Sequence, residues 1–401
     1  MHALSRFRVA ANRAVLPWLN IPTPLTFSGA DASLTLCRVI AGTGVRSLLV
    51  VTDPMLLQIG LLKAMLEALA AEGVTVEVFS EIAPDPDYAM VLAGMARLRS
   101  SGAQAILAVG GGSPMDCAKA MNLSQANGCH PSKLTGLWLY ARPRKRGLPF
   151  YAVPTTAGSG SEVTIAAIVA DPEAQSKRTI VDPKTLPDMV ALDPKLTAGL
   201  PQQITAPTGL DALTHAVEAY LSTMASAQTD AWALAATTLI ARALPKAYAD
   251  GSDLRAREDM LLGSTLAGMA FTRAGVGYVH ALSHQIGAIY HLPHGVVNAV
   301  VMPQVLTYYK PVRADRMARL ARAAGLGNDG EADDRLADAL IARLRELNDQ
   351  MGIPRHLEAL RSADFDRIID HAFAEAHGTY GVPRYLDRRA ARDLLQALVP
   401  N

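Results

Sequence analysis

Short apolar runs alternate with helix-length segments through the first part of the chain, and this alternation limits the fold more than any other feature. Residues 47–52 and 105–109 are strand-like apolar runs, and residues 74–79 alternate in hydrophobicity. Helix-length segments separate them, at about residues 56–71 and 87–100. Strands separated by helices of this length predict a parallel sheet with helices on both faces. We therefore expect an α/β domain in this part of the chain.

The character of the sequence changes near residue 200. Strand-like runs continue to about residue 192, whereas Ala, Leu and charged residues at helical spacing dominate after Pro201. The 401 residues, half of them hydrophobic, are enough to form two separate cores. The pattern predicts an α/β domain over residues 1–200 and an all-α domain over residues 201–401.

Composition excludes several classes of partner. The formal net charge is +1, from 38 basic and 37 acidic residues, so no nucleic-acid partner is expected. The N-terminal segment has no long apolar stretch and no run of 18 apolar residues occurs, so we expect neither a signal peptide nor a membrane span. The three cysteines form no disulfide framework, which indicates a cytoplasmic protein.

Three consecutive glycines follow the strand-like run at residues 105–109. Gly110, Gly111 and Gly112 let the backbone come close to a bound group, and Pro114 suits the first turn of a new helix. Backbone N–H groups at such a helix start can hold a pyrophosphate. The run lacks the Gly-x-Gly-x-x-Gly spacing, so a tight strand-to-helix turn without a ligand explains it equally well.

Two further segments suit a dinucleotide. Asp53 follows the first clear strand, where a carboxylate can bind a ribose and would repel a 2′-phosphate, so it favours NAD over NADP. An ordinary Asp-Pro turn is the alternative. Residues 155–162 follow the strand-like run 150–154 and combine hydroxyl groups with flexible glycines, as in a loop that lies along a cofactor.

Histidines concentrate in the predicted helical domain. Five of the ten lie there within a short span: His215, His280, His284, His291 and His294. Asp211 and His215 are four residues apart, as are His280 and His284, so each pair shares one helix face. His294 follows a proline, past an expected turn. One carboxylate and three imidazoles suffice for a divalent metal with an open coordination position, although spacing alone also fits hydrogen-bonded core histidines.

Four segments together resemble the iron-containing (group III) alcohol dehydrogenases. They are residues 110–116, 155–162, 209–218, and 280–287 with His294-Gly295. They occur in the order that the family has. The resemblance implies that residues 1–200 form a dinucleotide-binding α/β domain and residues 201–401 a helical metal-binding domain, with the metal in the cleft between them.

The resemblance also implies roles for individual residues. His284 is similar to the family's non-ligand histidine that faces nicotinamide and substrate. The implied metal ligands are Asp211, His215, His280 and His294. The implied NAD-binding residues are Asp53 at the ribose, Gly111, Gly112, Ser113 and Asp116 in the first loop, Thr155, Thr156 and Ser159 in the second, and Lys177. One departure is Asp85 between two prolines, where many members carry Asn, because Asp adds a negative charge beside the cofactor.

These features predict reversible, NAD-linked oxidation of a small-molecule alcohol to an aldehyde or ketone. The metal would act as a Lewis acid, and His284 would relay the hydroxyl proton. The resemblance favours Fe(II), although Zn(II) also suits three nitrogens and one oxygen. It also implies a homo-oligomer.

Three alternatives stay open. The first is polyol oxidation of the glycerol dehydrogenase kind. The second is a lyase similar to dehydroquinate synthase, although residues 206–295 lack the several basic partners that a phosphate-bearing substrate needs. The third is a metal that only joins the two domains.

Overall fold

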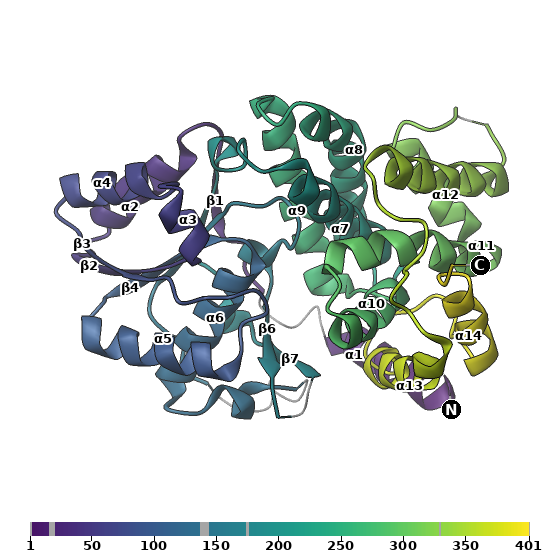
Figure 1. Cartoon of the computed structure of the whole chain (residues 1–401), viewed down its shortest axis with the longest axis horizontal. Helices are drawn as coiled ribbons and strands as arrows, with labels where there is room; N and C mark the ends of the chain where they lie inside the picture. The colour runs from purple at the N-terminus through teal and green to yellow at the C-terminus, as the bar shows by residue number, and fades with distance from the viewer. Residues whose placement is uncertain (1, 16–20, 137–143, 174–175, 329, 401) are drawn as a thin grey trace. The chain divides into compact units, whose positions relative to one another are not determined.

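The computed structural model describes residues 2–15, 21–136, 144–173, 176–328 and 330–400. These residues form two compact units (Figure 1). One unit lies within residues 20–199 and holds the sheet. The other contains the helices after residue 200 together with the N-terminal helix α1 (His2–Val15). The sequence pattern predicts a first domain over residues 1–200, whereas in the structure α1 belongs to the helical unit.

The sheet unit is built on a parallel sheet. Among the described residues this sheet has six strands in the order β1-β8-β5-β4-β2-β3, and every pairing is parallel. The strands are β1 (Leu25–Ser28), β2 (Ser47–Val51), β3 (Thr75–Phe79), β4 (Ala105–Gly110), β5 (Phe150–Pro154) and β8 (Met189–Leu192). The predicted fold, a parallel α/β region followed by an all-helical region, is confirmed.

Helices cover both faces of the sheet, as the alternation in the sequence predicts. In Figure 1, α2 and α4 lie on one face, and α5 and α6 lie on the other. The helices of this unit are α2 (Ala32–Gly42), α3 (Pro54–Gln58), α4 (Lys63–Ala71), α5 (Tyr88–Ser101) and α6 (Gly112–Asn127). The central strands are apolar throughout because both of their faces are buried, and all six residues of β4 are buried.

The chain order places a switch point between β2 and β4. From β2 the chain moves outward to β3, and it then returns to place β4 on the opposite side of β2. In open parallel sheets, ligands bind beyond the carboxyl ends of the strands at such a point. The segments that follow β2, β4 and β5 therefore share one edge of the sheet.

One helix expected from the sequence is interrupted. The predicted helix over about residues 56–71 forms as α3 and α4, which are separated at Gly60. Gly60 has φ +73°, a left-handed conformation that favours glycine. A smaller antiparallel hairpin, β6 (Ala166–Asp171) with β7 (Ser176–Val181), follows β5.

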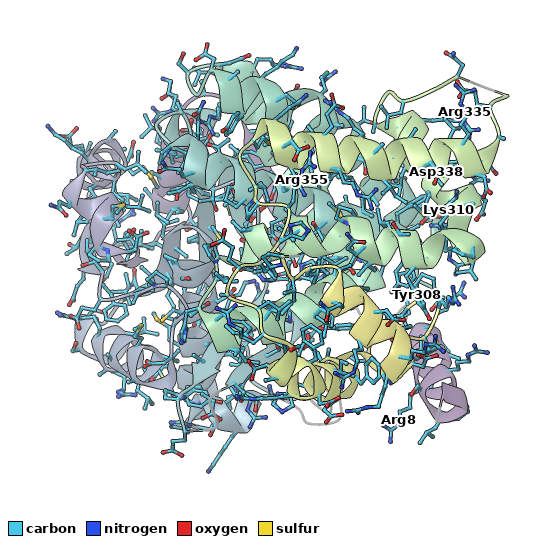
Figure 2. All side chains as sticks on the ribbon, turned by 45° about the vertical axis from the view of Figure 1, so that its right-hand side comes forward. Arg8, Tyr308, Lys310, Arg335, Asp338 and Arg355 are labelled. Atoms are coloured by element: carbon cyan, nitrogen blue, oxygen red, sulfur yellow. The ribbon has the colours of Figure 1, made fainter. Side chains whose placement is uncertain are left out.

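The helical unit contains all the described helices after residue 200. They are α7 (Gln202–Leu221), α8 (Ala227–Ala249), α9 (Leu254–Ala274), α10 (Tyr278–Tyr290), α11 (His294–Ala323), α12 (Asp333–Gln350), α13 (Phe365–Ala376) and α14 (Arg388–Gln396). Helices α11 and α12 pack side by side, and at their surface Lys310 donates to both carboxylate oxygens of Asp338, at 2.8 Å each (Figure 2).

Two expectations from composition can be compared with the structure. Cys37, Cys117 and Cys129 are free thiols. Over the part of the chain that is described, no helix is both long and apolar enough to cross a membrane.

Candidate metal centre and cofactor loops

Helix α7 supplies the first pair of predicted metal ligands. Asp211 and His215 lie one turn apart on the same helix face and are both buried. Phe271 of α9 stacks on the His215 ring, with ring centroids 4.2 Å apart at 19°. The imidazole is therefore packed between an aromatic ring and, on its other side, the ring of His280, whose centroid lies 4.6 Å away.

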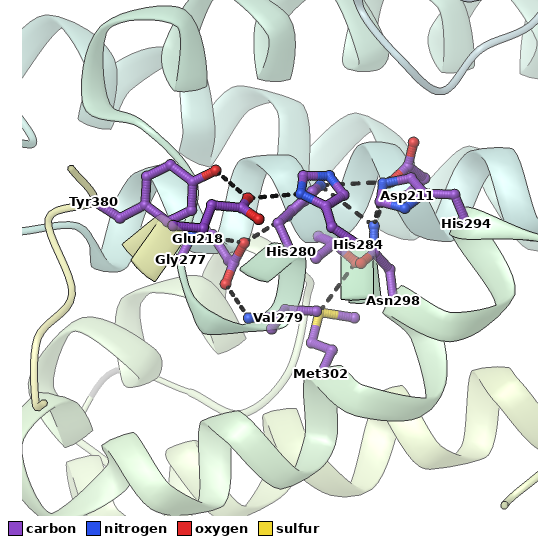
Figure 3. Close-up of polar contacts among 12 residues, drawn as sticks. Asp211, Glu218, Gly277, Val279, His280, His284, His294, Asn298, Met302 and Tyr380 are labelled. Atoms are coloured by element: carbon purple, nitrogen blue, oxygen red, sulfur yellow. Dashed lines mark hydrogen bonds and ion pairs between the residues drawn. The ribbon is translucent and has the colours of Figure 1, made fainter. Parts of the chain in front are cut away.

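His280 comes from the first turn of α10 and is oriented by Glu218. The Nδ1 atom of His280 lies 2.6 Å from Oε2 of Glu218, which is itself buried on α7. Gly277 and Val279 donate their backbone N–H groups to the same carboxylate, at 2.9 and 2.8 Å (Figure 3). Because the carboxylate accepts at Nδ1, the Nε2 atom of His280 keeps its lone pair for another partner.

Two pKa values reflect this burial. Desolvation lowers the pKa of His280 well below its ordinary value, and the nearby histidines lower it further. Its imidazole is therefore neutral, as a metal ligand must be. Burial raises the pKa of Glu218 to about 7, and the hydrogen bonds from Gly277, Val279 and His280 act against that rise.

His294 opens helix α11 directly after the turn at residues 291–293, as the sequence predicts. Its Nε2 atom lies 3.6 Å from Oδ1 of Asp211. Gly295 makes this approach possible, because a Cβ atom there would collide with the backbone carbonyl of Pro207 on α7. The first turn of α11 therefore sits directly against α7, next to the Asp211 side chain.

The four predicted ligands converge on one small region. Ligand atoms of Asp211, His215 and His280 lie within 4.8 Å of one another, the one such buried group of three found among the described residues. The amide nitrogen of Asn298 lies 2.7 Å from Oδ1 of Asp211, 3.3 Å from Nε2 of His280 and 3.0 Å from Nε2 of His294 (Figure 3).

The residue types at this centre are those that bind a divalent metal ion. Side-chain ligand atoms from three helices lie around one amide nitrogen, and a carboxylate with imidazoles is a donor set that binds divalent cations. The side chain of His294 is 35% exposed, whereas that of His280 is 3% exposed. Of these two candidate ligands, His294 is therefore the one that reaches the surface.

His284 lies beside this centre but faces a different partner. Its ring stacks on that of His294, with centroids 5.2 Å apart at 19°. Its Nδ1 atom lies 2.7 Å from Oε1 of Glu375, on α13. The structure thus brings His284 next to a predicted ligand while a carboxylate occupies its Nδ1 side.

The predicted cofactor loops lie at the shared edge of the sheet. Thr155 follows β5 and donates its backbone N–H to the carbonyl of Gly110 at the end of β4, at 3.0 Å. A Cβ atom on Gly111 would lie 3.3 Å from Oγ1 of Thr156, and one on Gly112 would lie 3.3 Å from Cβ of Ser159. The two loops are therefore in direct contact, and the glycines leave room for it.

The start of α6 fits an anion. Gly111 is the N-cap and Ser113 lies in the first turn of this 16-residue helix. Gly111 has no side chain with which to cap the first N–H groups of the helix, so this helix start suits a phosphate. Asp53, at the end of the neighbouring strand β2, accepts a hydrogen bond from the Leu56 backbone N–H through Oδ1, at 3.0 Å.

Two predicted cofactor residues, Asp116 and Lys177, bond to other side chains of the protein. Asp116 is half-buried, and its carboxylate accepts hydrogen bonds from Ser161 Oγ at 2.6 Å and from the Ile168 backbone N–H at 3.0 Å. Lys177 forms an ion pair with Asp85, at 2.6 Å. The extra charge of Asp85 is thus balanced by a lysine from β7.

Lys119 was not identified from the sequence, although it organises the second loop. Its side chain is 1% exposed, and its Nζ donates to the hydroxyl of Ser161, to the carbonyl and hydroxyl of Thr164, and to the carbonyl of Ala166, at 2.8–3.0 Å. Burial lowers the pKa of Lys119 to about 8, and the neighbouring Asp116 acts against that shift.

Sequence reasoning also assigned no role to Glu218, Asn298 or Glu375. Glu218 had a local signal, because it lies three residues after His215 on the same helix. Asn298 had a similar one, four residues after His294. Glu375 had none, since it is 91 residues from His284.

Comparisons with known proteins agree with these features. Residues 22–194 match the family model described as "Iron-containing alcohol dehydrogenase", and residues 205–399 match "Fe-containing alcohol dehydrogenase family, C-terminal". Alcohol dehydrogenase 4 of Saccharomyces cerevisiae (strain ATCC 204508 / S288c) is 38% identical over 357 residues, covering 88% of this chain and 91% of that protein.

Two further similarities extend the comparison. The 1,3-propanediol dehydrogenase of Klebsiella pneumoniae is 39% identical over 345 residues, which cover 85% of this chain and 88% of that protein. A crystal structure of 1,3-propanediol oxidoreductase superposes with a TM-score of 0.89 at 36% identity, covering 94% of this chain and 99% of that one.

Proposed function

The chain belongs to the iron-containing alcohol dehydrogenase family, and from this we propose how its residues divide the work of the reaction. It is an oxidoreductase that acts on CH–OH groups and is linked to NAD, as the sequence predicts. The family implies a divalent metal as well. The lyase alternative gains no support from these relatives, which are named as alcohol or propanediol dehydrogenases.

The metal ligands in this proposal are Asp211, His215, His280 and His294. The observation that carries it is the convergence of carboxylate and imidazole atoms from α7, α10 and α11, three of which lie within 3.3 Å of the Asn298 amide nitrogen. The ion is Fe(II), in keeping with the family, and Zn(II) is its competitor because it usually binds such sites more tightly.

The roles of the surrounding side chains follow from their contacts. When bound, the ion supplies a Lewis acid for the alcohol oxygen, and NAD supplies the hydride acceptor. Glu218 holds the His280 ring so that Nε2 faces the centre. His284 stacks on His294, and its Nε2 takes the hydroxyl proton of the alcohol, since imidazole titrates near neutral pH.

The cofactor side rests on the two touching loops. The first turn of α6, with Gly111, Gly112 and Ser113, binds the pyrophosphate. The loop with Thr155, Thr156 and Ser159 lies along the cofactor. Oδ2 of Asp53 is the atom proposed for the ribose, and its charge selects NAD over NADP.

Asp116 and Lys177 act less directly in this proposal. Asp116 holds the second loop through Ser161, and Lys177 neutralises Asp85. Both therefore shape the cofactor site through other residues.

The substrate class proposed is a small alcohol or diol, oxidised reversibly to the aldehyde or ketone. The support is the similarity to alcohol and propanediol dehydrogenases. Polyol oxidation of the glycerol dehydrogenase kind is the alternative, and glycerol is included among the test substrates for that reason.

The deciding experiment measures metal content and NAD-linked activity together. The protein is stripped of metal, reconstituted anaerobically with Fe(II) or Zn(II), and tested on simple alcohols, diols and glycerol. Activity restored by Fe(II) supports the proposal and names the ion. A tightly bound metal with no turnover on any alcohol or aldehyde contradicts it.

A cytoplasmic location and a homo-oligomeric state remain predictions. Cell fractionation tests the location, and light scattering on the purified protein tests the oligomeric state. Recovery of the protein in a membrane fraction, or a monomeric mass, would contradict the respective prediction.

A further inference from the structure

Glu375 makes a set of contacts that the proposed mechanism does not use. Its Oε1 atom lies 2.7 Å from Nδ1 of His284 and accepts a hydrogen bond of 2.6 Å from the hydroxyl of Tyr380. Its Oε2 atom accepts a hydrogen bond of 2.8 Å from the side-chain amide of Gln285. Both carboxylate oxygens are therefore held, by donors from α10 and from the loop after α13.

The donors around Glu375 favour its ionised form, since Tyr380 and Gln285 both donate hydrogen bonds to the carboxylate. Burial acts to raise its pKa, but His284 and the hydrogen bonds from His284 and Tyr380 lower that pKa overall. Tyr380 stays a neutral phenol, because burial and the nearby Glu375 charge raise its pKa well above the ordinary value. An ionised carboxylate can only accept hydrogen bonds, so both His284 and Tyr380 must donate to Oε1 of Glu375.

This requirement fixes the tautomer of His284. A neutral imidazole carries one N–H group, and here that group must be at Nδ1 to reach Glu375. The Nε2 atom then has a lone pair and can accept a proton. The ring of His284 stacks on that of His294, so it lies beside the proposed metal ligands. In Figure 3, His284 lies between Tyr380 on one side and Asp211 and His294 on the other.

The remaining contacts prevent the carboxylate from turning away. Rotation of Glu375 would break the bonds to Tyr380 and Gln285 as well as the one to His284. Gln285 follows His284 on α10, so the same carboxylate fixes two adjacent residues of that helix. The side chains of His284 and Glu375 are 20% and 26% exposed, which limits competition from water for these bonds.

We propose that Glu375, anchored by Tyr380 and Gln285, is the positioning residue that presents Nε2 of His284 to the hydroxyl proton of the substrate. This inference rests on the proposed function. During oxidation, the electron pair of the substrate C–H bond leaves with the hydride to NAD, and the O–H proton passes to Nε2. The resulting imidazolium lies against the Glu375 carboxylate, which stays ionised and stabilises it.

The test compares two variants with a matched control. Glu375→Ala removes the acceptor, whereas Glu375→Gln keeps an oxygen for the Nδ1–H group but loses the charge. Asp370→Asn is the control, because Asp370 lies on the same helix and is exposed, with Arg388 as its ion-pair partner. Surface pairs of this kind contribute little to stability.

The kinetic expectation is a loss in kcat with little change in KM. Glu375→Ala lowers kcat by about 10- to 100-fold, in line with the loss of a carboxylate that orients an essential histidine. Glu375→Gln loses less, and Asp370→Asn stays at the wild-type value. Metal content is unchanged in all three variants, because the Glu375 carboxylate bonds to His284, Gln285 and Tyr380, and none of these three is a proposed ligand.

A double-mutant cycle separates positioning from a general structural effect. If Glu375 acts only through His284, then Glu375→Ala causes no further loss in kcat when His284→Ala is already present. Fully additive losses would overturn the proposal, as would a Glu375→Ala enzyme with unchanged kcat. If Glu375→Ala fails to fold, Glu375→Gln and Tyr380→Phe take its place in the same cycle.

A spectroscopic readout does not depend on turnover. Long-range ¹H–¹⁵N spectra of the zinc-loaded, ¹⁵N-histidine-labelled protein report which ring nitrogen carries the proton, and His284→Ala identifies the relevant signals. Wild type shows the Nδ1–H form, and Glu375→Ala loses it. An Nε2–H form in wild type refutes the inference. If no alcohol is oxidised, the proposed function fails while these spectra still decide the role of Glu375.

Discussion

The two units build their sites from different parts of the polypeptide. In the sheet unit, the proposed cofactor groups are mostly backbone atoms and short side chains at strand ends, such as Gly111, Gly112 and Ser113. In the helical unit, the proposed metal groups are one carboxylate and three imidazoles from separate helices, and Glu218 on α7 orients the ring of His280 on α10. The cofactor site depends on how closely the backbone can approach the ligand, and the metal site depends on the orientation of individual imidazole rings.

This contrast indicates which changes each site tolerates. A site made from backbone N–H groups survives most side-chain changes but not the loss of a glycine that permits close contact. A site made from imidazoles survives changes in the loop backbone but not the loss of one ligand or of its orienting carboxylate. Substitutions in the two units should therefore separate NAD binding from metal binding.

The largest effect is expected for Asp211→Ala. Loss of this ligand removes the metal and lowers turnover by about 10³-fold or more, because a Lewis acid contributes several kcal/mol to the transition state. NAD affinity stays unchanged. Metal analysis, kcat and NAD titration are measured together, with the surface variant Asp338→Asn as the control. Near-normal activity after metal loss would break the comparison.

A smaller effect is expected for Glu218→Gln. The side-chain oxygen of Gln can still accept a hydrogen bond. Its NH₂ group cannot accept, so Gln cannot replace both oxygens that accept from Gly277, Val279 and His280. The orientation of His280 is weakened, and metal affinity falls by about 10- to 100-fold. Competition with a chelator measures this affinity. An unchanged metal affinity would mean that helix packing alone fixes the orientation of the His280 ring.

Gly110→Ala tests whether NAD binding in the sheet unit can be weakened without loss of the metal. Gly110 has φ +151°, and a Cβ atom there would lie 2.7 Å from Cγ of Pro114. Displacement of the loop is expected to weaken NAD binding by about 10-fold, since roughly 1.4 kcal/mol of strain or lost contact corresponds to that factor. Metal content is unchanged. Fluorescence titration with NADH gives the affinity, and a loss of metal would contradict the separation of the two sites.

The last effect is expected on stability rather than on binding, and it concerns pH and the buried Lys119. Its pKa is about 8 in the folded chain and 10.5 as the ordinary value, so the unfolded state binds more protons between these pH values. Stability contributed by this group therefore rises as pH increases through that window, by at most about 1.4 kcal/mol per pH unit. Urea unfolding of wild type and Lys119→Met at pH 8 and pH 10 measures the difference between them. An identical pH dependence in both proteins would contradict the lowered pKa.

Local patterns predicted most elements but not every boundary. The strand β4 and the glycines after it followed from an apolar run and a turn signal. The break between α3 and α4 did not follow, because a glycine inside a helix costs only about 1 kcal/mol and packing decides whether the helix continues. The grouping of α1 with the helical unit depends on long-range contacts such as Arg6 over the ring of Tyr385, with the guanidinium 5.8 Å from the centroid.

Local spacing along the chain is enough to predict which residues share a helix face or a sheet edge. Spacing of four residues aligns Asp211 with His215, and strand ends bring the glycine loop and the second loop to one edge of the sheet, because helix and strand periodicities are local. Which carboxylate reaches which imidazole ring depends on how the helices pack. Glu218 meets His280 across 62 residues and Glu375 meets His284 across 91, since contacts between helices arise from packing and leave no regular interval in the chain.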